Sequence, residues 1–435
     1  MKRALVWFKT NLRIDDNRPL IEAIAQNDEV IPVYIFDKKL FEQTAYQTKK
    51  MGLFRLKFLM ECLQELNEAL VEKGTRLLVI QGDTKKEISN LVQKYSVREV
   101  YAEFPIAYEE QKSQEEIENE LWKENTILKT YLCNYLLDEK DLPFPVSKLP
   151  DIFTDFRKKV ERECTIHEPI KCPNNIHSPL LPAFEIPQFE ELNSLQIDEK
   201  TAFPFNGGLF SVKQRLNYYL FESNKIEQYK KTRNGMLGSD YSTKFSPWLA
   251  LGCISPKEIF KSVSEYEQKV CKNDSTYWVI FELWWREYFY WVMRKYGIKL
   301  FQKNGIKSQS PIDRILNLEK LNQWKSGQTG NAFIDANMKE LNATGFMSNR
   351  GRQNVASYLV NDLEVDWRYG AAYFEEQLID YDVCSNWGNW AYIAGVGNDP
   401  RGHRVFNVKK QADDYDKNGD YRNYWTNLKL SIQNN

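Results

Sequence analysis

The residues best suited to binding an anion lie close together, between positions 242 and 247. Ser242, Thr243 and Ser246 supply hydroxyls, Lys244 supplies an amine, and Pro247 follows directly. Serine before proline is typical of the start of a helix, where hydroxyls and backbone N–H groups suit a diphosphate. Helix caps are common, so two capped helices joined by a loop explain the same residues at least as well.

A carboxyl on an aromatic helix face is the second candidate. Helical spacing places Trp278, Glu282, Trp285 and Phe289 on one face. A carboxyl in an aromatic pocket has a raised pKa and can donate a hydrogen bond. Arg286 stands four residues after Glu282, and an ion pair along the helix is the simpler explanation of both. The residues alone favour the ion pair.

Polar residues are also dense in the segments 345–353, 366–368 and 380–390. The region around them has a helical pattern, and burying polar side chains without partners is costly. Either these segments lie on the surface, or they line a polar cofactor pocket. Their residue types do not decide between the two.

Composition excludes several classes of protein. The seven cysteines include no C-x-x-C pair and there are only three histidines, so we expect reduced thiols, no disulfide framework and no metal site. No apolar stretch is long enough to span a bilayer, and the N-terminus lacks the features of a signal peptide. With a net charge of -1, any nucleic-acid site must be a local groove. We therefore expect a cytoplasmic protein that does not enter a membrane.

The first third of the chain alternates apolar runs with amphipathic segments. The runs predict five strands, and the clearest helical stripe lies between Leu59 and Leu70. Strands alternating with helices indicate βαβ units and a parallel, doubly wound sheet covered on both faces. The segment contains no G-x-G-x-x-G, which argues against a dinucleotide-binding Rossmann domain. The predicted strands are Ala4–Phe8, Val30–Phe36, Arg76–Gln81, Glu99–Phe104 and Ile127–Leu132.

Periodicity fades and prolines accumulate between residues 131 and 205. A long irregular connector is uncommon inside one compact domain, so this segment is expected to join two. After Gly207-Gly208 the pattern is helical to about Leu430. We expect an α/β domain over residues 1–130, a connector over 131–205 and an all-α domain over 206–435.

Several motifs together resemble the photolyase/cryptochrome superfamily, and most closely its DASH-type cryptochromes. The chain opens on Val6-Trp7-Phe8-Lys9, with lysine where the family usually has arginine. The match is strongest over residues 232–256 and 329–425, which include Asn349-Arg350-Gly351-Arg352-Gln353-Asn354. The resemblance covers nearly the whole chain and implies an N-terminal α/β domain, a connector and an all-α C-terminal FAD-binding domain.

The resemblance implies a FAD site in the helical domain. Arg352 and Asp380 match the family's ion pair beside the flavin. Asn386 is similar to the residue that faces flavin N5, where an amide can accept or donate a hydrogen bond. The full matched set is Tyr229, Ser242, Thr243, Lys244, Phe245, Ser246, Arg286, Arg352, Asp380, Asp382 and Asn386.

The resemblance also implies a light-driven reaction on pyrimidine dimers in DNA. Trp390, Trp367 and Trp324 correspond to the family's electron relay from the surface to the flavin, and the excited reduced flavin gives one electron to a flipped-out dimer. Ordinary core aromatics remain the alternative explanation of the three tryptophans. Glu282 matches the glutamate that contacts the dimer. The other matched substrate residues are Trp285, Asn349, Arg350, Gln353, Tyr392 and Arg404.

Departures from the family pattern narrow this expectation. Gln353 and Tyr392 replace a methionine and a second pocket tryptophan, which weakens stacking on the dimer and predicts a preference for single-stranded DNA. Asn349 and Gln353 also stand where a (6-4) photolyase would have histidines. Pro105 occupies the place of a glutamate in relatives that bind a folate, so 5,10-methenyltetrahydrofolate should bind weakly or not at all as an antenna.

We therefore expect a monomeric, DASH-type deoxyribodipyrimidine photo-lyase that repairs cyclobutane dimers under blue light. The main alternative is a blue-light signalling receptor that binds FAD and repairs little. Such receptors usually carry a long C-terminal extension, and this chain ends soon after Trp425. A nucleic-acid-binding regulator that uses the same groove without light is the third alternative.

Overall fold

A five-stranded parallel sheet forms the N-terminal part of the computed structural model, which describes residues 1–307, 314–401 and 405–426. The strand order is β3-β2-β1-β4-β5, and every neighbouring pair is parallel. The predicted strands are confirmed, with ends shifted by one or two residues. They are β1 Arg3–Phe8, β2 Glu29–Asp37, β3 Leu78–Gly82, β4 Glu99–Glu103 and β5 Ile127–Tyr131.

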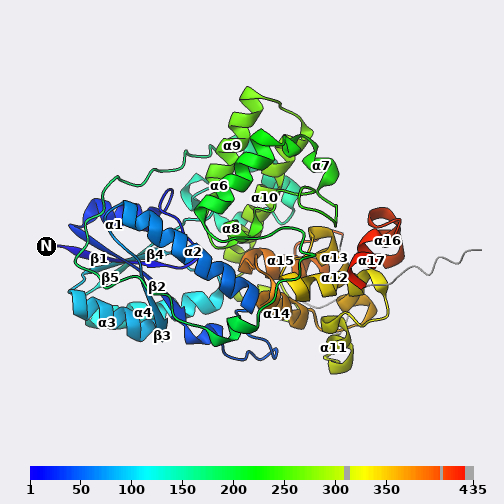
Figure 1. Cartoon of the computed structure of the whole chain (residues 1–435), viewed down its shortest axis with the longest axis horizontal. Coiled ribbons are helices and arrows are strands. Elements are labelled where there is room, and N and C mark those ends of the chain that lie inside the picture. Colours follow the sequence, from blue (N-terminus) through cyan, green and yellow to red (C-terminus); the bar gives the residue numbers. More distant parts are fainter. Residues whose placement is uncertain (308–313, 402–404, 427–435) are drawn as a thin grey trace, which may run out of the picture.

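Helices cover both faces of the sheet (Figure 1). Alternate residues of β1 enter two different apolar clusters: Val6 packs with residues of α1 and α2, whereas Leu5 packs with residues of α3 and α4. A strand buried on both faces reads as a continuous apolar run, as β1 does. The doubly wound α/β architecture is therefore confirmed. The helices are α1 Arg18–Gln26, α2 Leu53–Glu72, α3 Thr84–Tyr95 and α4 Tyr108–Lys123.

The connector over residues 131–205 is mostly irregular, but it contains a helix that the proline-rich sequence did not predict. This helix, α5 Phe153–Glu163, buries Phe156 and Val160 on one side. Apolar burial of that stripe stabilises a short helix that its own propensity would leave marginal. Three short 3-10 turns accompany it: Glu139–Asp141, Val146–Lys148 and Glu190–Ser194.

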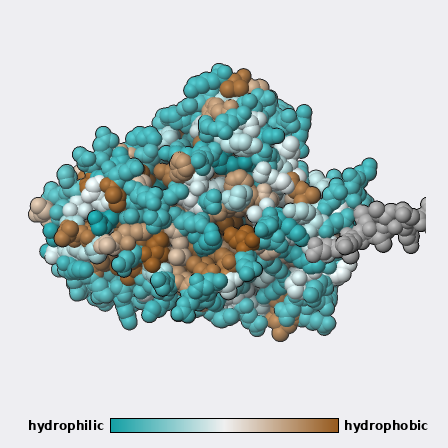
Figure 2. All heavy atoms as spheres, viewed as in Figure 1, coloured by the Kyte–Doolittle hydropathy of each residue, from teal (hydrophilic) through white to brown (hydrophobic). Residues whose placement is uncertain are grey.

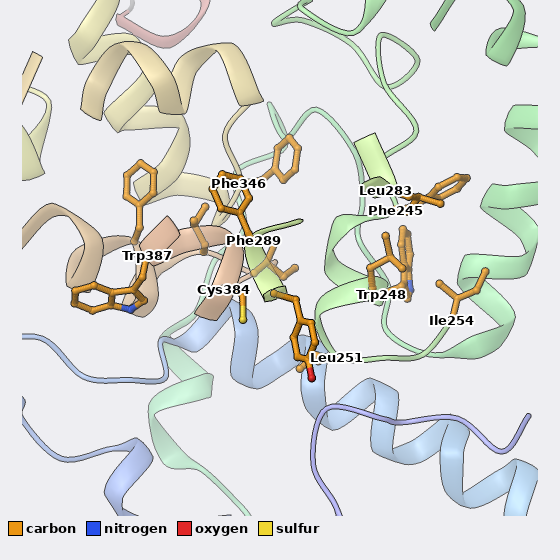
Figure 3. Packing of buried hydrophobic residues seen from close by; sticks show 14 of the residues in the cluster. Phe245, Trp248, Leu251, Ile254, Leu283, Phe289, Phe346, Cys384 and Trp387 are labelled. Carbon is orange, nitrogen blue, oxygen red and sulfur yellow. The ribbon is translucent and has the colours of Figure 1, made fainter. Parts of the chain in front are cut away.

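The rest of the described chain is helical, as predicted. The central helix, α10, is apolar on most sides and is buried among its neighbours; Figure 3 shows its Leu283 and Phe289 within the core. The helices are α6 Leu209–Asn217, α7 Tyr229–Thr232, α8 Ser246–Ala250, α9 Pro256–Lys269, α10 Asp274–Tyr296, α11 Leu318–Ser326, α12 Ala332–Thr344, α13 Asn349–Ser357, α14 Trp367–Gln377, α15 Val383–Ile393, α16 Val408–Tyr415 and α17 Asp420–Thr426. Short helical turns lie at Lys38–Leu40, Tyr218–Glu222, Lys225–Gln228, Gly297–Phe301 and Tyr358–Asp362.

The buried guanidinium of Arg13 joins three distant segments. Its Nη1 donates to Asn134 Oδ1 at 2.6 Å and to the Gly252 carbonyl at 2.9 Å. Its Nη2 donates to the carbonyls of Asp16 and Cys133, each at 2.7 Å. Hydrogen bonds from a charged donor are stronger than neutral ones. Arg13 therefore holds the loop after β1, the start of the connector and the loop after α8 together.

The surface is mostly hydrophilic on the face shown in Figure 2, with apolar patches near the middle of the molecule, between the sheet and the helical part. None of the helices in the described ranges is both long and apolar enough to cross a membrane. Within the same ranges, no group of three or more His, Cys, Asp or Glu side chains is placed to hold a metal ion.

Candidate cofactor and substrate site

A cavity of about 330 Å³ lies in the helical part, between α7, α8, α10, α13 and α15. Its size falls within the range of small-molecule and cofactor sites. All residues expected to bind the cofactor line it, and so do Glu282, Trp285, Asn349, Gln353 and Trp390. Four expected site residues are not part of the lining, and Arg404 lies outside the described residues. The four are Arg350, Tyr392, Trp367 and Trp324.

The loop over residues 242–246 is held from behind by Arg215 of α6. The Arg215 guanidinium donates to the carbonyls of Ser242 and Thr243, each at 3.0 Å, and pairs with Asp240 at 3.1 Å. Lys244 adopts a left-handed backbone conformation, with φ of 62°. Because these carbonyls are bound to Arg215, the loop can present its hydroxyls and N–H groups to the cavity.

Ser246 does not cap α8, contrary to the prediction. The helix begins at this residue and Pro247 occupies its first turn, but the Ser246 hydroxyl donates to Asp380 Oδ2 at 2.6 Å. Ser246 is the first helical residue and Phe245 holds the cap position, so the Ser246 hydroxyl donates instead to the carboxylate of Asp380, a charged acceptor that forms a strong hydrogen bond. Arg352 Nη2 donates to the same oxygen at 2.8 Å, so the expected Arg352–Asp380 ion pair is present.

Lys244 is buried and has aromatic neighbours. Its Nζ lies 3.3 Å from the ring centroid of Tyr241 and 4.7 Å from that of Phe346. Burial lowers the pKa of Lys244 well below its usual range, and the nearby carboxylate of Glu340 acts in the opposite direction. A negatively charged ligand in the cavity would favour the charged form of this lysine.

Three buried polar atoms of residues that line the cavity have no hydrogen-bond partner within the described part of the chain. They are Lys244 Nζ, Asp380 Oδ1 and the Tyr241 hydroxyl. Buried polar groups are nearly always hydrogen-bonded, so such atoms indicate a missing ligand or water. The amine of Lys244 suits a negatively charged group, the carboxylate of Asp380 suits a hydrogen-bond donor, and the Tyr241 hydroxyl suits either a donor or an acceptor. A ligand that fits all three combines negative charge with hydrogen-bond donors and acceptors. The diphosphate, ribityl chain and flavin ring of FAD together have this chemistry.

Glu282 is bonded to Arg233, and the predicted pair with Arg286 is wrong. Arg233 Nη1 donates to Glu282 Oε1 at 2.5 Å, and Trp278 Nε1 donates to the same oxygen at 3.1 Å. Arg286 instead pairs with Asp382 at 3.3 Å. Asp382 already pairs with Arg286, and a pair along a helix contributes only a few tenths of a kcal/mol (about 0.2–0.5). Glu282 therefore pairs with Arg233 at the end of α7.

The environment of Glu282 disfavours its charge. Desolvation raises the pKa of this carboxyl, while Arg233 and the Trp278 N–H lower it. The aromatic face predicted around it is present, because Trp285 stacks on Phe289 with centroids 5.6 Å apart. The neutral, donating form of Glu282 therefore persists to a higher pH than that of an exposed glutamate.

Asp382 and Asn386 both anchor α15 beside the cavity. Asp382 Oδ1 accepts from the Ser385 N–H at 2.7 Å and so caps the helix. Asn386 Nδ2 donates to the carbonyl of Ala371 on α14 at 3.0 Å. This leaves Asn386 Oδ1 as an acceptor, on a residue that lines the cavity.

Four of the expected substrate residues line the cavity, and Arg350 and Tyr392 contact two of these four. The four are Glu282, Trp285, Asn349 and Gln353. Trp285 stacks on Phe153 of α5, with centroids 3.7 Å apart and planes at 11°. It meets Tyr392 edge-on at 6.2 Å. At the rim, Arg350 Nη1 donates to Gln353 Oε1 at 2.9 Å. The structure thus brings Glu282, Trp285, Gln353 and their neighbours to the same cavity as the expected cofactor residues.

The three expected relay tryptophans are all buried. Trp390 is 2 % exposed, Trp367 1 % and Trp324 0 %. Trp324 packs edge-on against Trp390 at 6.1 Å and donates to the Val355 carbonyl at 2.9 Å. The expected path from the surface is therefore incomplete, because Trp324 is a core residue and does not reach solvent.

Two residues of the site were not predicted from the sequence, Arg215 and Arg233. Arg215 bonds to residues 24 to 28 positions away, and Arg233 to a residue 49 positions away. No spacing rule for helices or strands connects positions so far apart. Arg233 stands in the motif Thr232-Arg233-Asn234-Gly235, which marked the region but not its partner.

Comparisons with known proteins match both halves of the chain. The family described as DNA photolyase matches residues 4–174, and the FAD binding domain of DNA photolyase matches residues 278–431. A Cryptochrome DASH of Gloeobacter violaceus is 44% identical over 429 residues, which cover 98% of this chain and 85% of the relative.

Solved structures agree with this match over the full length. A Synechocystis cryptochrome superimposes with a TM-score of 0.93 at 42% identity, covering 98% of this chain and 88% of the other. An archaeal photolyase from Sulfolobus tokodaii, described with two FAD molecules, gives a TM-score of 0.77 at 27% identity, covering 99% and 91%. The likeness spans the sheet, the connector and the helical part together.

Proposed function

This chain belongs to the photolyase/cryptochrome superfamily, among its DASH-type cryptochromes, and its helical part is a FAD-binding domain; from that premise we propose that it repairs cyclobutane pyrimidine dimers under blue light, preferentially in single-stranded DNA. The observation that carries the proposal is one shared cavity. Residues suited to a flavin nucleotide and residues suited to a dimer line the same 330 Å³ space. A donor and an acceptor of electrons bound there would be in direct contact.

The residues of the chain hold and polarise the two ligands. When bound, FAD supplies the light absorption and the single electron that the reaction needs. The hydroxyls of Ser242 and Thr243 would bind its diphosphate, and Ser246, whose hydroxyl donates to Asp380, would contribute its backbone N–H at the start of α8. Asp380 and Asn386 would accept hydrogen bonds from the flavin ring. Arg352 fixes the position of Asp380 through their 2.8 Å bond.

Glu282 would bind the dimer. Its neutral carboxyl can donate a hydrogen bond to a carbonyl oxygen of the dimer, and that bond strengthens when the dimer becomes negatively charged. The Arg233 guanidinium now bonded to Glu282 can turn to a DNA phosphate when the substrate arrives, which would release the carboxyl in its neutral form.

Stacking in the pocket is reduced relative to a site with two tryptophans. Trp285 already has one face covered by Phe153, and Tyr392 and Gln353 replace larger or more polarisable side chains. Less stacking energy is then available to offset extrusion of the dimer from a duplex, at about 1–3 kcal/mol per stacked base. Single-stranded DNA needs no such extrusion, and we propose it as the preferred substrate.

Further parts of the proposal concern the whole chain. We propose domains at residues 1–130, 131–205 and 206–435, a monomer, and a cytoplasmic location. We also propose that Pro105 leaves any folate antenna weakly held. Gel filtration and the absorption spectrum of the purified protein test the oligomeric state and the antenna directly.

The function is tested by dimer loss under blue light. We expect purified protein to be yellow with about one FAD per chain, and the chemically reduced protein to remove cyclobutane dimers faster from single-stranded than from duplex oligonucleotides. A folded protein that takes up no added FAD contradicts the cofactor site. Bound FAD without repair of either substrate favours the signalling receptor, and equal rates on both substrates contradict the stacking argument.

Trp390 offers a test of the electron path into the cavity. Trp390→Phe should slow photoreduction of bound FAD in blue light with an external thiol, because, of the three expected relay tryptophans, Trp390 is the one that lines the cavity. The FAD content should not change. The matched control is Trp122→Phe, which alters a 74 % exposed tryptophan of α4. Equal photoreduction rates in the two variants would make Trp390 an ordinary core residue.

A further inference from the structure

The three expected relay tryptophans are too deeply buried to receive an electron directly from a reductant in solution. Trp390, Trp367 and Trp324 are each at most 2 % exposed. The sequence has no tryptophan between Trp291 and Trp324, so the segment that runs past Trp367 supplies no outer indole. Another aromatic residue must complete a path to the surface if these tryptophans conduct.

The first step of such a path lies along α14. A Cβ atom added to Gly370 would lie 2.3 Å from Trp390 Cη2, so the indole of Trp390 rests directly on this glycine. Trp367 precedes Gly370 by three positions on the same helix, a spacing that places side chains about 5–6 Å apart at Cβ. The indole of Trp390, which comes from α15, therefore contacts α14 one turn away from Trp367.

The next contacts lead outward to the α/β part of the molecule. Trp367 meets Trp387 of α15 with centroids 5.7 Å apart and planes at 75°. Trp387 is 4 % exposed, and Figure 3 shows it in the buried cluster on the same helix as Cys384. It meets Tyr46 at 6.2 Å. Tyr46 lies in the loop before α2 and is half-buried, so it is the first ring of the series with substantial access to solvent.

Trp324 does not offer an equivalent exit. Beyond Trp390 it contacts Phe374 at 6.1 Å and Tyr373 at 5.8 Å. Tyr373 is only 9 % exposed, and its hydroxyl donates to Asn342 Oδ1 at 2.6 Å. This branch ends in the core, whereas the branch through Trp387 ends at a residue that a reductant in solution can approach.

We propose that Trp387 and Tyr46 form the outer end of the electron path, in the order Tyr46, Trp387, Trp367, Trp390. The inference rests on the proposed light-driven reduction of bound FAD, which is the oxidant. In each turn Tyr46 loses one electron to the path and its phenolic proton to solvent, and the flavin gains one electron. A thiol in solution then returns one hydrogen atom, that is, one electron and one proton, to the Tyr46 oxygen.

The chemistry of Tyr46 suits this position. Burial raises the pKa of its phenol, and the carboxylates of Asp366 and Glu109 raise it further against the effect of Arg368. The phenol is therefore neutral before oxidation, and it releases its proton when the electron leaves. Tyr369, whose ring meets Tyr46 at 5.2 Å, is the nearest competing tyrosine.

The site of oxidation tests the proposal independently of repair. FAD-loaded protein is illuminated with blue light and no thiol, in the presence of a luminol derivative that attaches to tyrosyl radicals, and labelled peptides are mapped by mass spectrometry. We expect a light-dependent label on Tyr46. Trp387→Phe, which retains Tyr46, should lose that label, and Tyr46→Phe should slow photoreduction with thiol present. Tyr131→Phe, at a half-buried tyrosine of β5 far from the path, should change neither.

Other results of this labelling experiment would contradict either the path alone or the proposed photoreduction as well. A label on Tyr369 or Tyr373 with none on Tyr46, or a Tyr46 label that persists in correctly folded Trp387→Phe, overturns this path alone. If the parent protein photoreduces FAD but no tyrosine is labelled, the path through Tyr46 is overturned; if its FAD absorption does not change under blue light, the proposed photoreduction fails and the path with it. If Trp387→Phe binds no FAD, normal photoreduction by Tyr46→Phe is sufficient to overturn the proposal.

Discussion

Glu282→Ala is expected to lower repair of cyclobutane dimers in single-stranded DNA by about a hundredfold, while FAD content and photoreduction stay unchanged. Removing one preorganised donor to developing negative charge costs about 10²–10³ in rate, and a hydrogen bond from Glu282 to a reduced dimer is such a donor. The flavin-side residues do not depend on it, because Glu282 accepts its hydrogen bonds from Arg233 and Trp278. The measurement is dimer loss under blue light with chemically reduced protein.

The protonation state of Glu282 adds a pH dependence. Desolvation raises its pKa, so the neutral donor is present below the raised pKa and is lost as pH rises through it. Repair by the parent should therefore fall as the pH rises through the pKa of Glu282. This fall should occur at a higher pH than the value of about 4.3 at which an ordinary glutamate ionises. Glu282→Gln donates at every pH and is the matched control with a flat profile. If Glu282→Ala repairs as fast as the parent, this residue only partners Arg233.

Arg352→Ala is expected to lower the free energy of unfolding by about 3 kcal/mol and to prevent FAD binding. The change leaves the Asp380 carboxylate, whose side chain is 2 % exposed, without its ion-pair partner and, among the described residues, with the Ser246 hydroxyl as its remaining hydrogen-bond donor. Removing one member of a buried ion pair typically costs about 3–5 kcal/mol, and the partial exposure of Arg352, at 24 %, places this pair at the lower end. Urea unfolding of the FAD-free proteins measures the stability, and the absorption spectrum measures bound FAD.

A surface ion pair supplies the control for this variant. Lys261 pairs with Glu168 at 2.6 Å, with side chains 45 % and 74 % exposed. Lys261→Ala should leave the unfolding free energy nearly unchanged, as is usual for exposed pairs. If Arg352→Ala is as stable as Lys261→Ala, the Asp380 carboxylate is solvated in the absence of its partner, and the pair serves the cofactor and not the fold.

The sheet and its covering helices could be predicted from the sequence because their signals are local. Alternation of apolar runs, and stripes such as that from Leu59 to Leu70, depend on neighbouring residues only. Helix α5 was missed because prolines surround it, and its stability comes from burying Phe156 and Val160 against residues far along the chain. The local helix propensity of a segment gives no information about packing partners that lie far along the chain.

The site could be predicted as a set of residues but not as a network. Family motifs indicated which residues would gather, and the structure places the expected cofactor residues around one cavity. Not all hydrogen-bond and ion-pair partners within that set could be predicted. The sequence predicted an ion pair of Glu282 with Arg286, and a helix cap by the Ser246 hydroxyl. In both cases a charged group from a distant segment is involved: Asp382 pairs with Arg286 and leaves Glu282 to Arg233, and Asp380 accepts from the Ser246 hydroxyl. Only the tertiary structure brings these groups together.

Burial was the property of the tryptophans that the sequence could not supply. An indole on a helix has the same local pattern whether its outer edge meets water or a second helix. Trp324 is enclosed by α13 and α14 and lies in the core, while Trp387 carries the contacts toward the surface.

The position of Arg13 also bears on the order in which the nascent chain can complete its structure. A ribosome finishes the last strand of the sheet at Tyr131, but the carbonyl of Gly252 that accepts from Arg13 is made later. At about 5–20 residues per second, that interval is on the order of ten seconds. During this interval the Arg13 guanidinium lacks the Gly252 carbonyl as an acceptor. The contact between the loop after β1 and the loop after α8 therefore cannot form yet. The hydrogen bonds of Arg13 that join the two parts of the molecule are therefore completed only after the loop that follows α8 has been synthesised.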